Sequence, residues 1–308
     1  MTNTVAKLSK SVREYKRDAI FTPILVVAEV AMDVVIPMLI SHLIDFGITP
    51  GDMDYIYKVG FQLVFACLAA LALGVLSGRF AAKASAGFAK NLRKDMYYNV
   101  QNFAFSNIDK FSTPSIITRM TTDVTNVQMS FQMMIRVAVR APIMLVSALF
   151  MAFRLGGKLA MVYLIVIPVL GFGLYFISIS VAKIFKRAFK RYDALNAAVQ
   201  ENVSGIRVVK SYVREDYEIE KFNAMSNEMR QDFTQAENRL ALNMPMMQLC
   251  IYGTMTAIFW FGSRFIMNGS MTTGNLMSLV TYTMQMLNSM MMLSMVFTMI
   301  VMSRASME

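Results

Sequence analysis

Apolar residues fall into long runs along this chain, and polar stretches of very different length separate the runs. Each run has the ~20 residues that a helix rising ~1.5 Å per residue needs to cross the hydrocarbon core of a bilayer. The pattern predicts six transmembrane helices, over residues 19–41, 57–82, 131–153, 159–180, 244–267 and 276–301. We therefore expect an all-α, multi-pass membrane protein whose two termini lie on the same side of the membrane.

Two polar links, residues 83–130 and 181–243, are much longer than the other connections, and their composition remains compatible with helix. A helix that continues about 20–25 residues past the membrane projects roughly 30–40 Å from it. We expect two helical arms, the first interrupted near residues 109–114 and the second at Ser204-Gly205.

The segment 201–222, around the second interruption, is too polar to cross a membrane and lies in the largest gap between apolar runs. Gly205 permits a break or a close approach there, because glycine tolerates backbone conformations that other residues avoid. Two interpretations stay open: a docking site for a soluble partner, or a solvated turn between two helices.

Lysine and arginine are concentrated in the N-terminal segment and in the two long links, while the short loops carry few of them. Cytoplasmic segments of membrane proteins carry such an excess, so we expect both termini and both arms in the cytoplasm. The net charge of +10 then faces the anionic lipid of the inner leaflet, and we expect the lipid bilayer but no nucleic acid as a partner. A hydrophobic content of 56% with only 16% charged residues argues against an ordinary soluble domain.

The first predicted span contains two carboxylates, Glu29 and Asp33, four residues apart and hence on one helix face. Ionisable residues inside a span are costly and usually face the bundle interior or a water-filled cavity. One hypothesis is that they attract a cationic substrate or carry a proton along a substrate pathway. The other, which we favour slightly, is that they bond to a neighbouring helix.

Small residues recur every fourth position in the second predicted span, with Gly74-x-x-x-Gly78 at its centre. Such a stripe lets another helix approach closely, which is how spans associate inside lipid. We expect this helix to pack along its length against other spans.

Methionine is abundant in the last two predicted spans, and Met284, Met291 and Met295 are candidates to line a substrate pathway. Its flexible, polarizable side chain suits surfaces that accept varied apolar partners. The alternative is a compositional preference for methionine among lipid-facing residues.

The residues required for several kinds of chemistry are missing from the sequence. With one histidine there is no Ser-His-Asp arrangement and no histidine cluster for a metal, and both cysteines lie within predicted spans. Gly157-Lys158 lacks the first glycine and the Ser or Thr of a phosphate-binding loop. We expect no catalytic residue, no metal and no nucleotide bound by this chain.

Several motifs resemble those of ABC exporter membrane domains. The second intracellular loop of that family is similar to Glu201-x-x-x-Gly205-Ile206-x-Val208-Val209-Lys210-x-Tyr212. The first intracellular loop of that family is similar to Leu92-Arg93 followed by Ile117-x-Arg119-x-x-x-Asp123-Val124. The outer end of the first span and the entry to the sixth resemble Leu43-Ile44-Asp45-x-Gly47 and Thr273-Gly274-Asn275-Leu276. The stretch 111–124 is most similar to subunits of bacterial, largely Gram-positive, heterodimeric multidrug exporters, although Pro114 replaces a glycine that many members carry.

The resemblance implies a six-helix domain in the bacterial plasma membrane that pairs with a second such subunit. A heterodimer with a different subunit is expected rather than a homodimer. ATP and Mg²⁺ would bind in nucleotide-binding domains outside this sequence. We expect these domains either on a continuation of a truncated chain or on a separate polypeptide. The chain would thus be part of an ATP-hydrolysing translocase that exports drugs, lipids or other amphipathic solutes by alternating access. Two coupling helices would contact the nucleotide-binding domains through Asp109, Lys110, Phe111, Ser112, Thr113 and Pro114, and through Asn202, Val203, Ser204, Gly205, Ile206 and Arg207.

Two alternatives come from other classes of protein. A secondary transporter would use buried ionisable pairs along its pathway and no ATPase, and Glu29 and Asp33 are the residues that favour it. A membrane-anchored scaffold would use the arms only for docking a cytoplasmic partner.

Overall fold

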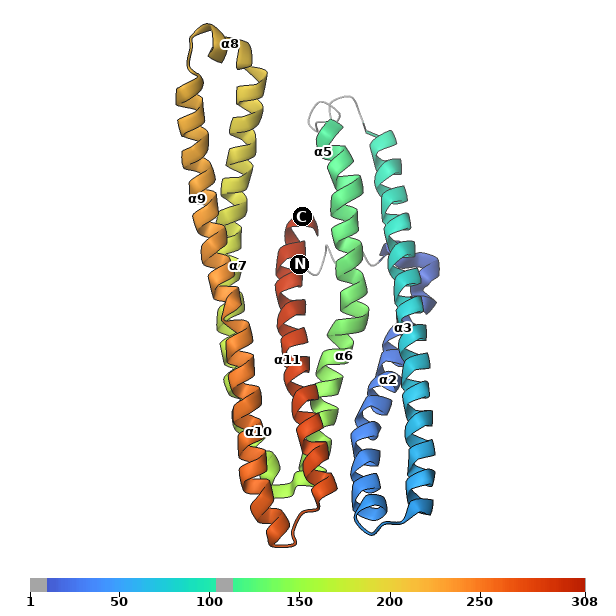
Figure 1. Cartoon of the computed structure of the whole chain (residues 1–308). Coiled ribbons are helices and arrows are strands. Elements are labelled where there is room, and N and C mark those ends of the chain that lie inside the picture. The colour runs from blue at the N-terminus through green and yellow to red at the C-terminus, as the bar shows by residue number, and fades with distance from the viewer. Residues whose placement is uncertain (1–9, 104–112, 308) are drawn as a thin grey trace. The chain divides into compact units, whose positions relative to one another are not determined.

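The computed structural model describes residues 10–103 and 113–307, and every element in these two ranges is a helix. The long helices are α2 (Lys16–His42), α3 (Met53–Gln101), α6 (Val124–Gly156), α7 (Met161–Ser204), α9 (Glu215–Ala241), α10 (Asn243–Met267) and α11 (Thr273–Met307) (Figure 1). The short ones are η1 (Lys10–Tyr15), η2 (Leu43–Ile48), α5 (Thr113–Thr118), η3 (Arg119–Asp123), η4 (Gly157–Ala160) and α8 (Ile206–Ser211). The all-α prediction is confirmed for this part of the chain.

Four helical stretches are long and apolar enough to cross a membrane: Lys10–Ile48, Met53–Gln101, Ile116–Ser204 and Glu215–Met267. The third contains both α6 and α7, and therefore two of the predicted spans. The sixth predicted span lies in α11, which is not among the four stretches found in the described residues. The chain is a membrane protein with several apolar helices, and the count of six spans stays a prediction.

Two helices are much longer than a bilayer is thick. With 49 residues in α3 and 44 in α7, these helices measure about 74 Å and 66 Å at ~1.5 Å per residue, against ~30 Å for the hydrocarbon core. α3 continues without a break from the second predicted span into the first polar link, and α7 continues from the fourth predicted span into the second link. Each link thus begins as a continuation of the preceding helix.

The described residues up to Val169, together with those from Cys250 onward, form one compact unit. Within it α2 packs along α3, and α6 packs along α11, with further contacts between α2 and α6 (Figure 1). The core between these helices is apolar and includes Val34 of α2, Ala148 of α6, and Leu279, Tyr282 and Met286 of α11.

The centre of the small-residue stripe of α3 lies close to two neighbouring helices, while Ala82 and Ala86 further along the stripe are exposed. A Cβ added at Gly74 would lie 3.1 Å from Glu29 Oε1 of α2, and one added at Gly78 would lie 3.4 Å from Arg136 Nη1 of α6. The two glycines therefore make room for charged side chains on both adjacent helices.

Pro37 interrupts the hydrogen bonding of α2, and α11 supplies the missing donor. Because proline has no N–H, the carbonyl of Asp33 four residues earlier has no partner inside the helix. Gln285 Nε2 donates to that oxygen at 3.1 Å, and Ser278 Oγ donates to the carbonyl of Pro37 itself at 2.5 Å. Polar side chains of α11 thus satisfy the backbone of a proline-containing span, as a bundle within lipid requires.

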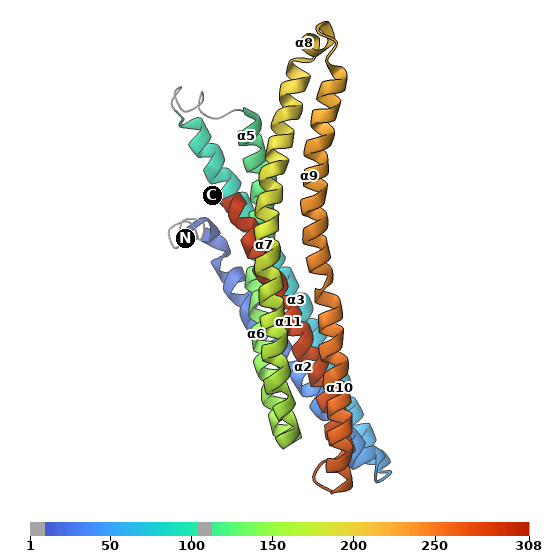
Figure 2. The same ribbon diagram turned by 90° about the vertical axis from the view of Figure 1, so that its left-hand side faces the viewer.

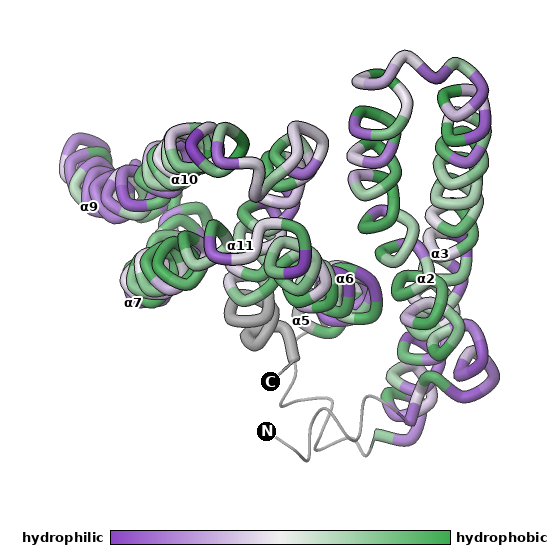
Figure 3. Tube along the Cα trace, turned by 90° about the horizontal axis from the view of Figure 1, so that it is seen from below, coloured by the Kyte–Doolittle hydropathy of each residue, from purple (hydrophilic) through white to green (hydrophobic). Residues whose placement is uncertain are grey.

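Residues 170–249 form the second compact unit, in which α7 and α9 run side by side and α8 lies at the end of the pair (Figures 1 and 2). α9 is largely hydrophilic (Figure 3), which fits its place in a polar link. Phe185 of α7 and Phe233 of α9 meet edge to face with ring centroids 6.1 Å apart.

A buried carboxylate joins the two helices of this arm. Asp232 of α9 accepts a hydrogen bond from Arg187 Nε at 2.8 Å, and Arg191 Nη1 lies 2.9 Å from its other oxygen. The hydrogen bond from Arg187 and the two positive charges hold the pKa of Asp232 below its usual range. Because the pKa is lowered, the pairing of Asp232 with the two arginines stabilises the folded arm at pH values above the ordinary aspartate pKa of ~3.9. This stabilisation is lost as the pH falls through the folded-state pKa.

Replacing this carboxylate should loosen the arm. In Asp232→Asn the two arginines lose their shared anion, and we expect backbone amides of α7 and α9 near the site to exchange with deuterium about tenfold faster at neutral pH. The variant Glu237→Gln, which removes a carboxylate from an exposed position of the same helix, is the matched control. Equal exchange rates in both variants would contradict a bridging role for Asp232.

Candidate functional site

Three charged side chains meet between α2 and α6. Arg140 of α6 contacts Glu29 through Nη1 and lies 2.7 Å from Asp33 Oδ2 through Nη2. Ser77 Oγ of α3 donates to the second oxygen of Glu29 at 3.2 Å. Glu29 is 7% exposed, and a buried carboxylate is costly unless charged or hydrogen-bonding partners surround it.

The arrangement matches the hypothesis that both carboxylates bond to a neighbouring helix. Sequence reasoning missed Arg140, although the rule that singled out Glu29 and Asp33 applies to it as well. It is an arginine inside the third predicted span, one helical turn after Arg136. Among Glu29, Asp33 and Arg140 there is one more negative charge than positive, and the side chain of Asp33 remains 23% exposed.

The candidate methionines lie on one face of α11, at spacings of seven and four residues. Met284 and Met291 are half-buried, and Met295 is 60% exposed. Two other methionines of the same helix, Met286 and Met290, are buried in the unit. The candidate face is therefore the more accessible one.

The second interruption lies where it was predicted, at the end of the α7–α9 arm. α7 ends at Ser204, and α8 begins at Ile206 after Gly205. Gly205 has an ordinary φ of −93°, so no left-handed conformation requires glycine here. Its lack of a side chain matters instead for a close approach, because an added Cβ would lie 3.3 Å from the carbonyl oxygen of Glu201.

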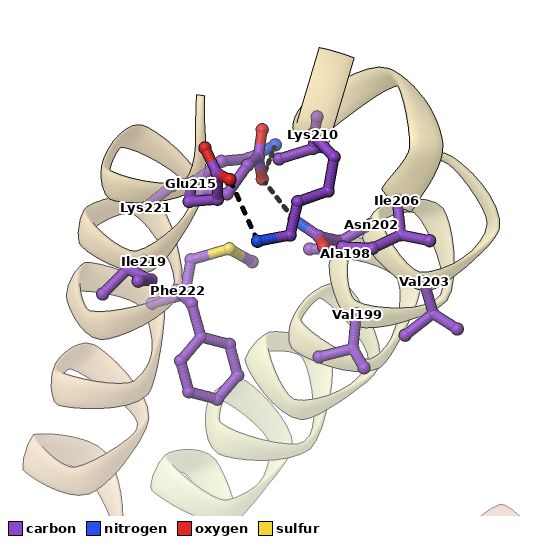
Figure 4. Close-up of a pocket in the computed structure, with 13 residues that line it drawn as sticks. Ala198, Val199, Asn202, Val203, Ile206, Lys210, Glu215, Ile219, Lys221 and Phe222 are labelled. Atoms are coloured by element: carbon purple, nitrogen blue, oxygen red, sulfur yellow. Dashed lines mark hydrogen bonds and ion pairs between the residues drawn. The ribbon is translucent and has the colours of Figure 1, made fainter. Parts of the chain in front are cut away.

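A pocket of about 410 Å³ opens beneath this end of the arm (Figure 4). Its wall is mainly apolar, and its residues from α7, α8 and α9 include Val199, Val203, Ile206, Ile219 and Phe222. Polar side chains line it as well. Asn202 Nδ2 donates to Glu218 Oε2 at 3.0 Å, and Lys210 Nζ donates to Glu215 Oε1 at 3.0 Å (Figure 4). A hydrogen bond from its own backbone, together with Lys210, lowers the pKa of Glu215.

Apolar side chains are exposed at this end of the arm although the surrounding helices are polar. Val203 is 67% exposed, Val208 60% and Ile206 44%. The structure brings the six candidates of the second coupling segment, residues 202–207, together on the last turn of α7 and the first turn of α8. Exposed apolar groups clustered in this way are typical of interaction surfaces.

The first coupling segment falls largely outside the described residues. Asp109, Lys110, Phe111 and Ser112 lie there, while Thr113 and Pro114 are the first two residues of α5. Its candidate role stays a prediction.

The structure also shows a polar junction that sequence reasoning left without a role. Asp45, in the π-helical segment η2, accepts hydrogen bonds from the backbone N–H of Gly274 at 2.8 Å and from Thr272 Oγ1 at 2.6 Å. Ser41 Oγ donates to Asn275 Oδ1 at 2.9 Å. Asp45 thus caps the N-terminus of α11, where a carboxylate is favoured by the free N–H groups and the helix dipole. The two motifs that carried the family resemblance at these positions contact each other.

Comparison with known proteins agrees with this architecture. Residues 19–290 match the family described as ABC transporter transmembrane region. The chain belongs to this family.

Three similar proteins come from bacteria. The uncharacterized ABC transporter ATP-binding protein YfiB of Bacillus subtilis (strain 168) is 29% identical over 259 residues, covering 84% of this chain and 45% of YfiB. The similarly named Rv1273c of Mycobacterium tuberculosis (strain ATCC 25618 / H37Rv) is 29% identical over 309 residues, covering 98% and 52%. The putative export ATP-binding/permease protein RT0691 of Rickettsia typhi (strain ATCC VR-144 / Wilmington) is 24% identical over 282 residues, covering 90% and 48%. This chain spans about half the length of these relatives.

Proposed function

We propose that this chain is the membrane-spanning part of an ATP-driven exporter in the bacterial plasma membrane, with both termini in the cytoplasm. ATP and Mg²⁺ bind in a nucleotide-binding domain outside this sequence, and their hydrolysis drives alternating access. A second transmembrane subunit, a different chain rather than an identical copy, completes the pathway. The names of the relatives, which contain "ATP-binding" and in one case "export ATP-binding/permease", support this proposal.

One observation carries the proposal: the exposed apolar end of the α7–α9 arm. Valine and isoleucine side chains are exposed at the end of an otherwise polar helical pair. Their burial against a partner would be favourable because it removes apolar surface from water. Contact with a nucleotide-binding domain through residues 202–207 gives this surface an occupant, and the long helices α7 and α9 connect it to apolar segments.

Drugs, lipids or other amphipathic solutes are the proposed substrates. Glu29 and Asp33 near α6, with the accessible face of α11 that carries Met284, Met291 and Met295, are the proposed pathway residues. The contacts of Arg140 with both carboxylates are compatible with a secondary transporter too, and the relatives' names, which contain "ATP-binding", favour the ATP-driven exporter over that alternative. A scaffold without transport is tested by the experiment below.

Charged residues at the end of the arm should uncouple the transporter. In the assembled protein, including its ATP-binding part, we expect Val203→Asp with Ile206→Asp to reduce ATP-dependent ethidium uptake into inside-out vesicles at least about tenfold, because two apolar contacts of the interface are lost. Both positions are exposed, so folding and membrane insertion should not change.

Tyr192→Asp provides the control, since Tyr192 is 47% exposed on α7 away from the end of the arm. Undiminished transport in the double variant would contradict the docking role of residues 202–207. Wild-type vesicles that bind an ATPase but move no solute would favour the scaffold.

A further inference from the structure

Arg136, in the third predicted span, lies one helical turn before Arg140 and has no ion-pair or hydrogen-bond partner among the described residues. Its side chain is half-buried. Arg140, by contrast, holds two carboxylates, those of Glu29 and Asp33. A charge inside a span is costly when nothing balances it, so electrostatics alone would favour one carboxylate for each arginine.

The four charges are spaced so that each arginine can face one carboxylate. Glu29 and Asp33 are four residues apart on α2. Arg136 and Arg140 are four residues apart on α6, so each pair lies on one face of its helix. The two helices run in the same direction within the first compact unit (Figure 1).

A small shift of α6 would complete the pairing. Arg140 contacts both carboxylates and is therefore level with the midpoint between them. Moving α6 by two residues toward its own C-terminal end, about 3 Å, would place Arg140 opposite Asp33. The same movement would place Arg136 opposite Glu29.

The glycine-lined face of α3 leaves room for this exchange. An added Cβ at Gly74 would lie 3.1 Å from Glu29 Oε1, and one at Gly78 would lie 3.4 Å from Arg136 Nη1. Because the two glycines are one helical turn apart, the carboxylate and the guanidinium rest on the same face of α3, roughly 5 Å from each other along its axis. Neither glycine places a side chain between them.

Hydrogen bonds hold α11 to α2, whereas α6 meets both helices with small apolar residues. Side-chain donors of α11 bond to backbone carbonyls of α2 at three positions, from Ser278, Tyr282 and Gln285. α6 contributes Ala148 and Ala152 to the core between the helices, and both ion pairs between α6 and α2 are made by Arg140. Shifts of packed helices by an ångström or more, up to a full turn, are a known form of conformational switching.

We infer that α6 has a second register against α2, adopted during the transport cycle, in which Glu29 exchanges Arg140 for Arg136 and each carboxylate has its own arginine. Arg136 is then a positioning residue, because it acts through Glu29 and stabilises the shifted helix. The inference rests on the proposed function, since the cycle of ATP binding and hydrolysis would drive the shift. The same four charges thus stabilise two positions of α6.

A double-mutant cycle between Glu29→Gln and Arg136→Gln tests the exchange in the assembled transporter, including its ATP-binding part. Melting temperatures in detergent are compared without nucleotide and after trapping with ATP and vanadate. Without nucleotide, Arg136→Gln should not lower the melting temperature. In the trapped state it should lower it by about 3 °C, but not when Glu29→Gln is already present, because the effects of two residues in contact are not additive.

Transport should depend on the same exchange. We expect Arg136→Gln to slow ATP-dependent ethidium uptake into inside-out vesicles about tenfold, and Arg136→Lys, which keeps the charge, to retain most of the activity. Arg79→Gln is the matched control, since it removes an exposed arginine from the second predicted span. It should show no coupling to Glu29→Gln in either state.

Additive effects of Glu29→Gln and Arg136→Gln in the trapped state would overturn the inference, as would equal coupling with and without nucleotide. If the wild-type transporter moves ethidium and is trapped by vanadate while this coupling is absent, only this inference fails. If the wild type neither moves ethidium with ATP nor is trapped, the proposed function fails, and this inference fails with it.

Discussion

Arg140→Gln is expected to destabilise the unit around α2, α3 and α6 by about 3 kcal/mol, because removing one partner of a buried ion pair leaves the other charge uncompensated. Two carboxylates are affected here, since the guanidinium contacts both Glu29 and Asp33. Glu29 is only 7% exposed and would retain Ser77 as its one partner of those described above. Thermal unfolding of the purified transporter in detergent measures the effect as a melting temperature several degrees lower.

The matched control removes all three charges at once. A variant with Glu29→Gln, Asp33→Asn and Arg140→Gln replaces each charged group by a neutral amide and leaves no unpaired charge within this cluster, so most of the lost stability should return. A melting temperature for the triple variant that is lower still than that of Arg140→Gln would show that the ion pairs are not what Arg140 contributes.

Gly274→Ala is expected to disrupt the junction between α2 and α11, at a cost of about 1–3 kcal/mol as for other overpacked sites. An added Cβ would overlap the carbonyl oxygen of Ser41 and lie 2.6 Å from Asp45 Oδ2. One neighbour is backbone and cannot rotate away, and the other is the carboxylate that caps α11. The helices must therefore separate or the cap must break, and thermal unfolding in detergent measures the loss.

Gly60→Ala makes the same chemical change where space is available. Gly60 lies within α3, and an added Cβ would have no neighbour within 4 Å. Alanine favours helix over glycine by ~1 kcal/mol, so this variant should be as stable as the wild type or slightly more so. Equal melting temperatures for Gly274→Ala and Gly60→Ala would show that the α2–α11 junction adapts without cost.

Most of the helical architecture could be predicted from the sequence, because helices reflect local composition and periodicity. The runs of apolar residues predicted where helices cross the membrane, and the polar links between them predicted continued helix. Ser204 and Gly205 marked the break between α7 and α8. The helix period placed Glu29 and Asp33 on one face, and the fourfold spacing of small residues predicted the close approach that Gly74 and Gly78 make to α2 and α6.

The contacts that give these residues their roles come from the tertiary structure alone, since they join positions far apart in the chain. Arg140 reaches Asp33 across 107 residues, and Gly274 reaches Asp45 across 229. No periodicity within one helix specifies such a partner. Val213 has a φ of 51°, a backbone conformation that its own β-branched side chain disfavours. The sequence by itself indicated which segments are helical and marked the break at Ser204-Gly205, while the packing of those helices decided which charges pair, because such pairs join residues that are distant in the chain.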